Sequence, residues 1–146
     1  MTHDELVGRV QSRAGLPSRG DAERAIRATL ESLAERLDGE IGQHLAAQLP
    51  QEIGRHLLID TEFRRLDLDE FFKHVHEREG EGVDLPDSVY HARVVIEVIG
   101  EAVSQGAMEK IRSVLPAEFG PLFEGSAGRM RTAAAEQRKG NALESR

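Results

Sequence analysis

Residues 44–57 read HLAAQLPQEIGRHL, and the proline at position 50 interrupts what is otherwise the pattern of an amphipathic helix. Proline fits the first turn of a helix and disfavours helical geometry at the residue before it. Leu49 is therefore expected to end one helix and Pro50 to begin another. A related stretch, VLPAEFGPLF, occupies residues 114–123, so the same step occurs twice in the chain.

The two steps belong to a longer duplication. Placing Leu49-Pro50 on Leu115-Pro116 gives an offset of 66 residues, and apolar positions then meet apolar positions through most of both halves. The pairs are Leu30 with Ile96, Leu33 with Ile99, Leu37 with Val103, Leu45 with Ile111, and Ile53 with Phe119. The opening segments DELVGRV and DEFFKHV pair at an offset of 65. Repeats of this kind indicate a structural unit that is used twice.

Each unit is expected to contain a helix, a loop, a long helix, a short helix, the Leu-Pro step and a second short helix. Apolar residues recur at steps of three and four in the long segments, which is the period of one helix face. This spacing predicts a first helix over about residues 2–13 and long helices over about 21–37 and 86–104. The stretch VVIEVIGEAV in the last of these is rich in β-branched residues, but the helical spacing continues on both sides of it.

The second long helix carries an additional apolar face, formed by Val94 and Val98. The corresponding face of the first unit is largely Arg and Glu. Two explanations stay open at this point. Either the helix lies at the centre of the molecule between the repeats, or Val94 and Val98 form an interaction face that meets a second copy or another protein.

The sequence therefore predicts an all-α fold, a compact bundle of about eight helices. Repeat 1 covers residues 2–58 and repeat 2 covers 68–124, and the two are expected to pack about a pseudo-twofold axis into a single domain, 1–124. A unit of this size buries too little apolar surface to be stable alone. Residues 59–69 contain few helix breakers and are expected to form a short ordered connector.

The Leu-Pro steps are interpreted as structural joints rather than active sites. Glu52 and Glu118 recur beside them, in the first turn after each proline. A carboxylate at that position is expected to meet unpaired backbone amides and the positive end of the helix dipole. Leu49, Leu115 and the following Ile53 and Phe119 are expected to hold both arms of each joint against the core.

Histidines are the side chains that titrate near neutral pH, and the densest group is HVHE at residues 74–77. His74 and His76 are two apart, so on a helix they point about 200° apart and chelate one ion poorly. No histidine recurs at the equivalent position of the other repeat. We expect solvated or locally bonded histidines, no metal site and no cofactor, against the alternative of a single unduplicated metal or acid-base site.

The composition of the sequence argues against several classes of function. The formal net charge of −7 opposes binding to nucleic acid, and the absence of cysteine excludes thiolate chemistry and disulfides. No apolar run has the length of a membrane span and the N-terminus lacks the features of a signal peptide, so a cytoplasmic location is expected. Residues 125–146 form a basic tail, flexible or helical, which could be solvated, fold back onto the acidic body or contact an acidic partner.

No catalytic constellation is recognisable. The sequence has no GxSxG motif, phosphate-binding loop or nucleotide fingerprint. Most carboxylates lie three or four residues from an arginine, the arrangement of a solvated helix surface. The aromatic residues occupy apolar positions or lie beside them, which favours a role in the core. The sequence therefore predicts a protein that is not an enzyme.

The duplicated pattern, with QLPQEIGRHL in the first unit and VLPAEFGPLF in the second, resembles a bacterial family known as domain of unknown function 2267. The resemblance covers about residues 3–124. It implies an all-helical fold and a bacterial origin, and it carries over no catalytic residues.

Two hypotheses for function follow. The first is a protein that acts by protein–protein interaction or self-association through the face around Val94 and Val98. The alternative is a small-molecule or lipid binder with an apolar cavity between the two repeats, because pockets in helical bundles form between facing helices.

Overall fold

The computed structural model describes residues 1–125, and within them the chain is all-α, with seven α-helices, two 3-10 helices and no β-strand. Because η1 continues α4 directly, these elements make eight helical segments, as predicted. They are α1 (His3–Ala14), α2 (Arg19–Arg36), α3 (Gly39–Ala47), α4 (Gln51–Gly54), η1 (Arg55–Leu57), α5 (Leu68–Glu79), α6 (Leu85–Ala102), α7 (Gln105–Val114) and η2 (Ala117–Phe123). The prediction for the basic tail concerns residues 125–146, of which 126–146 lie outside the described residues.

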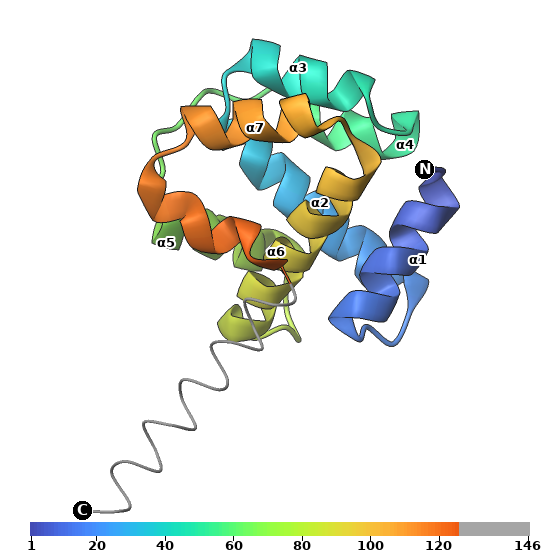
Figure 1. Cartoon of the computed structure of the whole chain (residues 1–146). Helices are drawn as coiled ribbons and strands as arrows, with labels where there is room; N and C mark the ends of the chain where they lie inside the picture. The colour runs from blue at the N-terminus through green and yellow to red at the C-terminus, as the bar shows by residue number, and fades with distance from the viewer. Residues whose placement is uncertain (126–146) are drawn as a thin grey trace, which may run out of the picture.

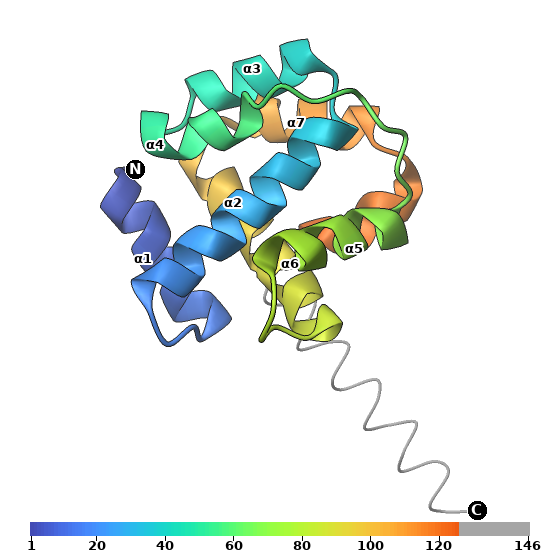
Figure 2. The same ribbon diagram turned by 180° about the vertical axis from the view of Figure 1, so that it is seen from behind.

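The two long helices, α2 and α6, form the centre of the bundle (Figures 1 and 2). They contact each other, and α1 and α5 each contact both of them. Helices α3 and α7 lie next to each other across one end of the bundle, at the top of Figure 1. Every long helix therefore has neighbours from both halves of the sequence.

Polar side chains at the helix starts explain where several helices begin. Thr2, Ser18 and Ser104 each accept a hydrogen bond from the backbone amide three residues later, which satisfies an amide that the helix itself leaves free. At α5 the Asp67 side chain accepts from the Glu70 amide at 2.8 Å and the Glu70 carboxylate accepts from the Asp67 amide at 3.2 Å. This reciprocal pair is a capping box.

Both halves of the chain contribute to one hydrophobic core. Ile26, Leu30 and Leu33 of α2 are at most 1% exposed, and they belong to the same cluster as residues from α5 and α6. The Phe71 and Phe119 rings meet edge to face with their centroids 6.0 Å apart. The core is continuous across the middle of the sequence, so neither half needs to be stable alone.

The β-branched stretch in the second half is helical, as predicted, and lies within α6. The observed helix is Leu85–Ala102, slightly earlier than predicted, because Asp84 takes the N-cap position and Pro86 fits the first turn. Although α2 and α6 each have 18 residues, no helix within residues 1–125 is long and apolar enough to cross a bilayer.

The connector between η1 and α5 is ordered, as predicted, although it contains no helix of its own. The Arg64 amide donates to the Glu35 carbonyl at 2.8 Å, and the Arg36 guanidinium donates to the Leu66 carbonyl at 2.8 Å. Leu66 is buried. These contacts hold the connector against the C-terminal end of α2.

Candidate functional site

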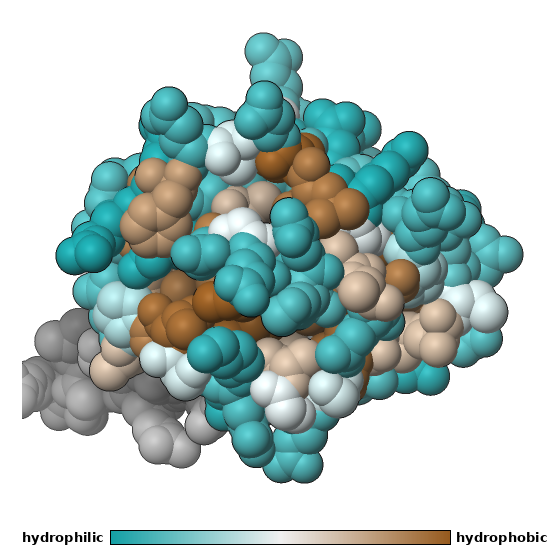
Figure 3. Space-filling view, turned by 90° about the horizontal axis from the view of Figure 1, so that it is seen from above, coloured by the Kyte–Doolittle hydropathy of each residue, from teal (hydrophilic) through white to brown (hydrophobic). Residues whose placement is uncertain are grey.

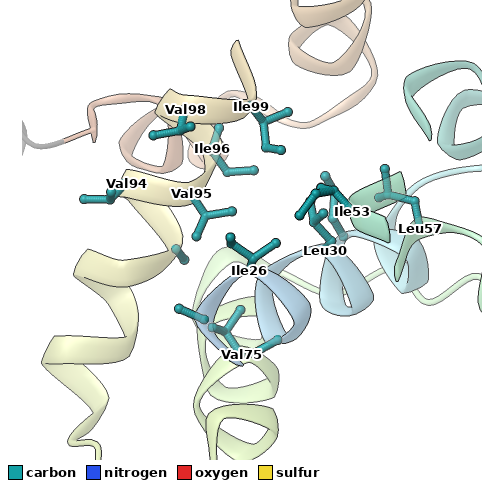
Figure 4. Close-up of a cluster of buried hydrophobic side chains, with 14 of the residues drawn as sticks. Ile26, Leu30, Ile53, Leu57, Val75, Val94, Val95, Ile96, Val98 and Ile99 are labelled. Atoms are coloured by element: carbon teal, nitrogen blue, oxygen red, sulfur yellow. The ribbon is translucent and has the colours of Figure 1, made fainter. Parts of the chain in front are cut away.

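Val94 and Val98, the predicted interaction face, are fully buried inside the single chain. Their side chains point away from Ile26, whereas Val95 on the next face points toward it (Figure 4). Helix α6 contacts α1, α2, α5 and η2, so it has neighbours on several sides. Of the two explanations left open by the sequence, the structure therefore agrees with the first, a helix at the centre of the molecule. Neither valine is available to a partner.

Each Leu-Pro step separates two helices, although α3 ends at Ala47 rather than at Leu49 and each proline is an N-cap residue rather than the first residue of the next helix. Pro50 (φ −52°, ψ 141°) and Pro116 (φ −59°, ψ 156°) are both extended N-cap residues, and a short helix follows each. Leu49 and Leu115 are only 8% and 7% exposed. The steps therefore bend the chain while an apolar side chain stays in contact with the core.

The expected capping role of Glu52 and Glu118 is not observed. Both occupy the first turn after the proline, but within residues 1–125 neither carboxylate accepts a hydrogen bond from a backbone amide. Both side chains are exposed, so water competes for them. Each glutamate can therefore stabilise the short helix after its proline only through the weaker attraction between its negative charge and the N-terminal end of that helix.

The histidines are dispersed and have different partners. His74 Nδ1 lies 3.3 Å from a Glu35 carboxylate oxygen, while His76 Nε2 lies 2.8 Å from the Val83 carbonyl. The pair therefore points in two directions, as helical geometry requires. Within residues 1–125 no three His, Asp or Glu side chains are arranged to hold a metal ion.

A buried hydrogen-bonded pair, His91 with Glu79, was not identified from the sequence. His91 Nδ1 lies 2.9 Å from Glu79 Oε2, and the two side chains are 8% and 2% exposed. The residues come from α6 and α5 and are separated by a loop, so no local pattern connects them. Ser88, one turn before His91, is fully buried and its hydroxyl has no hydrogen-bond partner within the described residues. The histidine is therefore not paired with a serine nucleophile.

The largest cavity among those described is an open groove between α3 and α7, with a volume of about 750 Å³. Its apolar residues are Ile41, Leu45 and Ala47 from α3 and Ala107 and Ile111 from α7. Seen from above, this end of the molecule shows hydrophobic surface between polar side chains (Figure 3). We call this feature the α3–α7 groove.

Polar residues border the α3–α7 groove. Asp38, Glu40, His44 and Lys110 belong to its lining. Gln48, also in the lining, accepts a hydrogen bond through Oε1 from the Ser104 amide at 2.8 Å, which connects the end of α3 to the start of α7. This contact fixes the spacing of the two helices at one end of the groove.

Sequence reasoning suggested an apolar cavity between the repeats but did not say which helices would line it. Leu45 and Ile111 were paired as apolar positions at the 66-residue offset. Leu45 and Ile111 are indeed 2% and 3% exposed. The space between the helices depends on their separation, and no residue pattern encodes that directly.

These observations define the protein as an all-α helical bundle with a groove on its surface. Within residues 1–125, no group of side chains is arranged as in a metal site. Its sequence matches a known family over residues 3–122, that of the uncharacterized conserved protein DUF2267. The chain belongs to the DUF2267 family, as its duplicated Leu-Pro motif indicated. A comparison with curated proteins returned no match.

Proposed function

We propose that the protein is a non-enzymatic binding protein that takes an apolar small molecule, such as an acyl chain, into the α3–α7 groove. The observation that carries this proposal is the groove of about 750 Å³ with Ile41, Leu45 and Ile111 in its lining. Ligand sites in proteins usually have volumes of about 300–1,000 Å³ and a mostly apolar lining with a few polar groups. The α3–α7 groove agrees with the volume criterion, and half of the residues in its lining are apolar.

We infer that the two halves are homologous repeats and that the groove lies between equivalent helices. At the 66-residue offset, Ile41 pairs with Ala107 and Leu45 with Ile111, all of them in the groove lining. The order of helices is also similar in the two halves. This agrees with the sequence-based hypothesis of an apolar cavity between the repeats.

The first of the two sequence-based hypotheses, protein–protein interaction or self-association, depended on Val94 and Val98 as an exposed face. Because both are buried in the chain, no observation favours that surface. A non-enzymatic role is supported by the described histidine contacts, none of which pairs a histidine with a nucleophilic hydroxyl.

The test is a titration with a fluorescent fatty acid, comparing the protein with the variant Ala107→Phe. Ala107 is half-buried in the groove lining, so a phenyl group there would occupy the space of the ligand. We expect saturable binding by the unmodified protein and a loss of affinity of about tenfold or more, which corresponds to about 1.4 kcal/mol, in the variant.

The matched control is Val114→Phe. Val114 lies on the same helix, is 38% exposed and does not belong to the groove lining. It introduces the same phenyl group outside the groove, so affinity should be unchanged. Absence of saturable binding, or equal losses in both variants while both remain folded by circular dichroism, would show that the groove is not the binding site.

A further inference from the structure

A second cavity, with a volume of about 630 Å³, is lined by residues of α1, α2, α4, η1 and the C-terminal end of α5. Ile26 and Ile53, both buried, belong to its lining. The basic groups around it are Arg24, Arg27, Arg55, Arg78, His3 and His56. We call it the cationic cavity.

The charge of the cationic cavity is opposite to that of the whole protein. Its lining contains four arginines against three glutamates, Glu23, Glu52 and Glu79. The chain as a whole has 26 acidic and 19 basic residues. One carboxylate oxygen of Glu79 already lies 2.9 Å from His91 Nδ1, a residue outside the cavity lining.

Three of the arginines keep hydrogen-bonding capacity for a ligand. The nearest carboxylate oxygens to Arg24 and Arg27 are those of Asp21 at 3.9 Å and Glu31 at 3.8 Å, both beyond hydrogen-bond distance. Arg55 is exposed and has no ion pair within residues 1–125. A guanidinium group without a close partner can offer several N–H donors to phosphate oxygens.

Arg78 differs from these three, because its donors are occupied. It forms an ion pair with Glu35, lies 3.7 Å from Glu31 and donates to the Ser32 hydroxyl at 2.9 Å. Its role is to connect α5 to α2, so the ligand contacts are assigned to Arg24, Arg27 and Arg55.

The imidazole of His56 lies among the positive charges of the cavity. Its pKa is lowered, first by burial and then by the charge of Arg55, with smaller contributions from Arg27 and His3, while Glu31 acts in the opposite direction. The groups come from η1, α2 and α1. An anion bound beside them would offset their charge and raise the pKa of His56.

The fold does not require this cationic lining. At the 66-residue offset, Arg24 corresponds to Tyr90, Arg55 to Pro121 and His56 to Leu122. None of these counterparts carries a charge, although Leu122 is fully buried in the core. Arg27, by contrast, corresponds to Arg93, so the second half keeps one of the three arginines but does not repeat the cationic group as a set.

We propose that the cationic cavity binds a small phosphorylated molecule, with Arg24, Arg27 and Arg55 in contact with its phosphate oxygens. The volume suits a small molecule, and planar guanidinium groups match phosphate geometry. The described lining has no aromatic residue other than its two histidines on which a base could stack, so recognition rests on the phosphate groups.

The test is isothermal titration calorimetry with inorganic pyrophosphate, comparing the full chain with the double variant Arg27→Gln and Arg55→Gln. The control is Arg65→Gln, which removes one charge from an exposed residue of the connector outside the cavity. We expect one site, an affinity that falls with ionic strength, at least about a tenfold loss in the double variant and no loss in the control.

A second measurement follows His56 by NMR, where saturating pyrophosphate should raise its pKa. Vesicles of phosphatidylcholine with phosphatidate distinguish the source of the phosphate. Binding of pyrophosphate alone supports a free phosphorylated ligand, and binding of both supports a lipid headgroup. No saturable binding of pyrophosphate, or equal affinity in the double variant and the Arg65 control, would overturn the proposal.

Discussion

The replacement of Gly54 by alanine tests how closely the first Leu-Pro joint packs. A Cβ atom at Gly54 would lie 2.7 Å from the Ala46 carbonyl oxygen and 3.3 Å from the Ala46 Cα. Gly54 has helical dihedral angles (φ −59°, ψ −29°), so alanine is compatible with the backbone and only the contact opposes it. Because the contacted atoms are backbone atoms of α3, no side-chain rotation can relieve the overlap.

Overpacking of this kind costs about 1–3 kcal/mol. For a domain of this size each kcal/mol lowers the melting temperature by about 4 °C, so Gly54→Ala should melt about 4–12 °C below the unmodified protein. Urea denaturation followed by circular dichroism would give the free energy of unfolding, and an unchanged m-value would show that the transition is the same.

Gly120 provides the matched control, because it occupies the equivalent position 66 residues later and an added Cβ would meet no atom within 4 Å. Gly120→Ala should therefore cost less than Gly54→Ala, since its added Cβ is opposed only by the following Pro121, which disfavours helical geometry at the residue before it. Truncation of Ala46 to glycine should not rescue Gly54→Ala, because its backbone stays in place. Equal stability of the two alanine variants would refute the reasoning.

Two further predictions concern the helix starts and the contact between α1 and α6. Asp67→Ala should lower the free energy of unfolding by about 1 kcal/mol through loss of the capping box, and Asp84→Ala, at an N-cap without a side-chain hydrogen bond, should lower it less in the same urea assay. Hydrogen bonds from Arg13, and also from Arg9, lower the pKa of Glu101. Its contribution to stability is therefore complete above its unfolded-state pKa and is lost as the pH falls through the lower folded-state pKa. Glu101→Gln should accordingly show a smaller loss of stability on acidification than the unmodified protein, and parallel pH profiles in urea denaturation would contradict this.

The helices could be predicted from the sequence because their signals are local. The stripe of Ile26, Leu30 and Leu33 repeats with the helical period, and all three are buried in the structure. The duplication also helped where the local signal was ambiguous. The β-branched stretch of α6 could have been a strand, but its counterpart in the first half has a clear helical pattern, so a helix was predicted. Boundaries were less accurate: α2 begins at Arg19 rather than 21, because Ser18 accepts from the Asp21 amide and so starts the helix earlier.

Features that depend on two distant elements could not be predicted in the same way. The α3–α7 groove depends on the separation of two helices, and the cationic cavity collects residues from α1, α2, α4, η1 and α5. The capping role assigned to Glu52 failed for a different reason. Position in the first turn makes such a hydrogen bond geometrically accessible, but an exposed carboxylate forms it only when it is more favourable than hydration.

The burial of Val94 and Val98 could have been anticipated from charge patterns on two helices. Arg9 and Arg13 are four residues apart on α1, and Glu97 and Glu101 are four residues apart on α6. In the structure Arg9 lies 2.8 Å from Glu101, and Arg13 lies 2.9 Å from Glu97 and also pairs with Glu101.

Helix α1 also had an apolar stripe, Leu6, Val7 and Val10, that needed a neighbour, and all three residues are fully buried. Two unpaired apolar faces in one chain, each bordered by charges of opposite sign, can cover each other without a second molecule. Intramolecular contact is favoured in that case, because it avoids the loss of translational and rotational freedom that association requires. An additional apolar face therefore indicates a partner protein only after the other unpaired faces of the same chain have been considered.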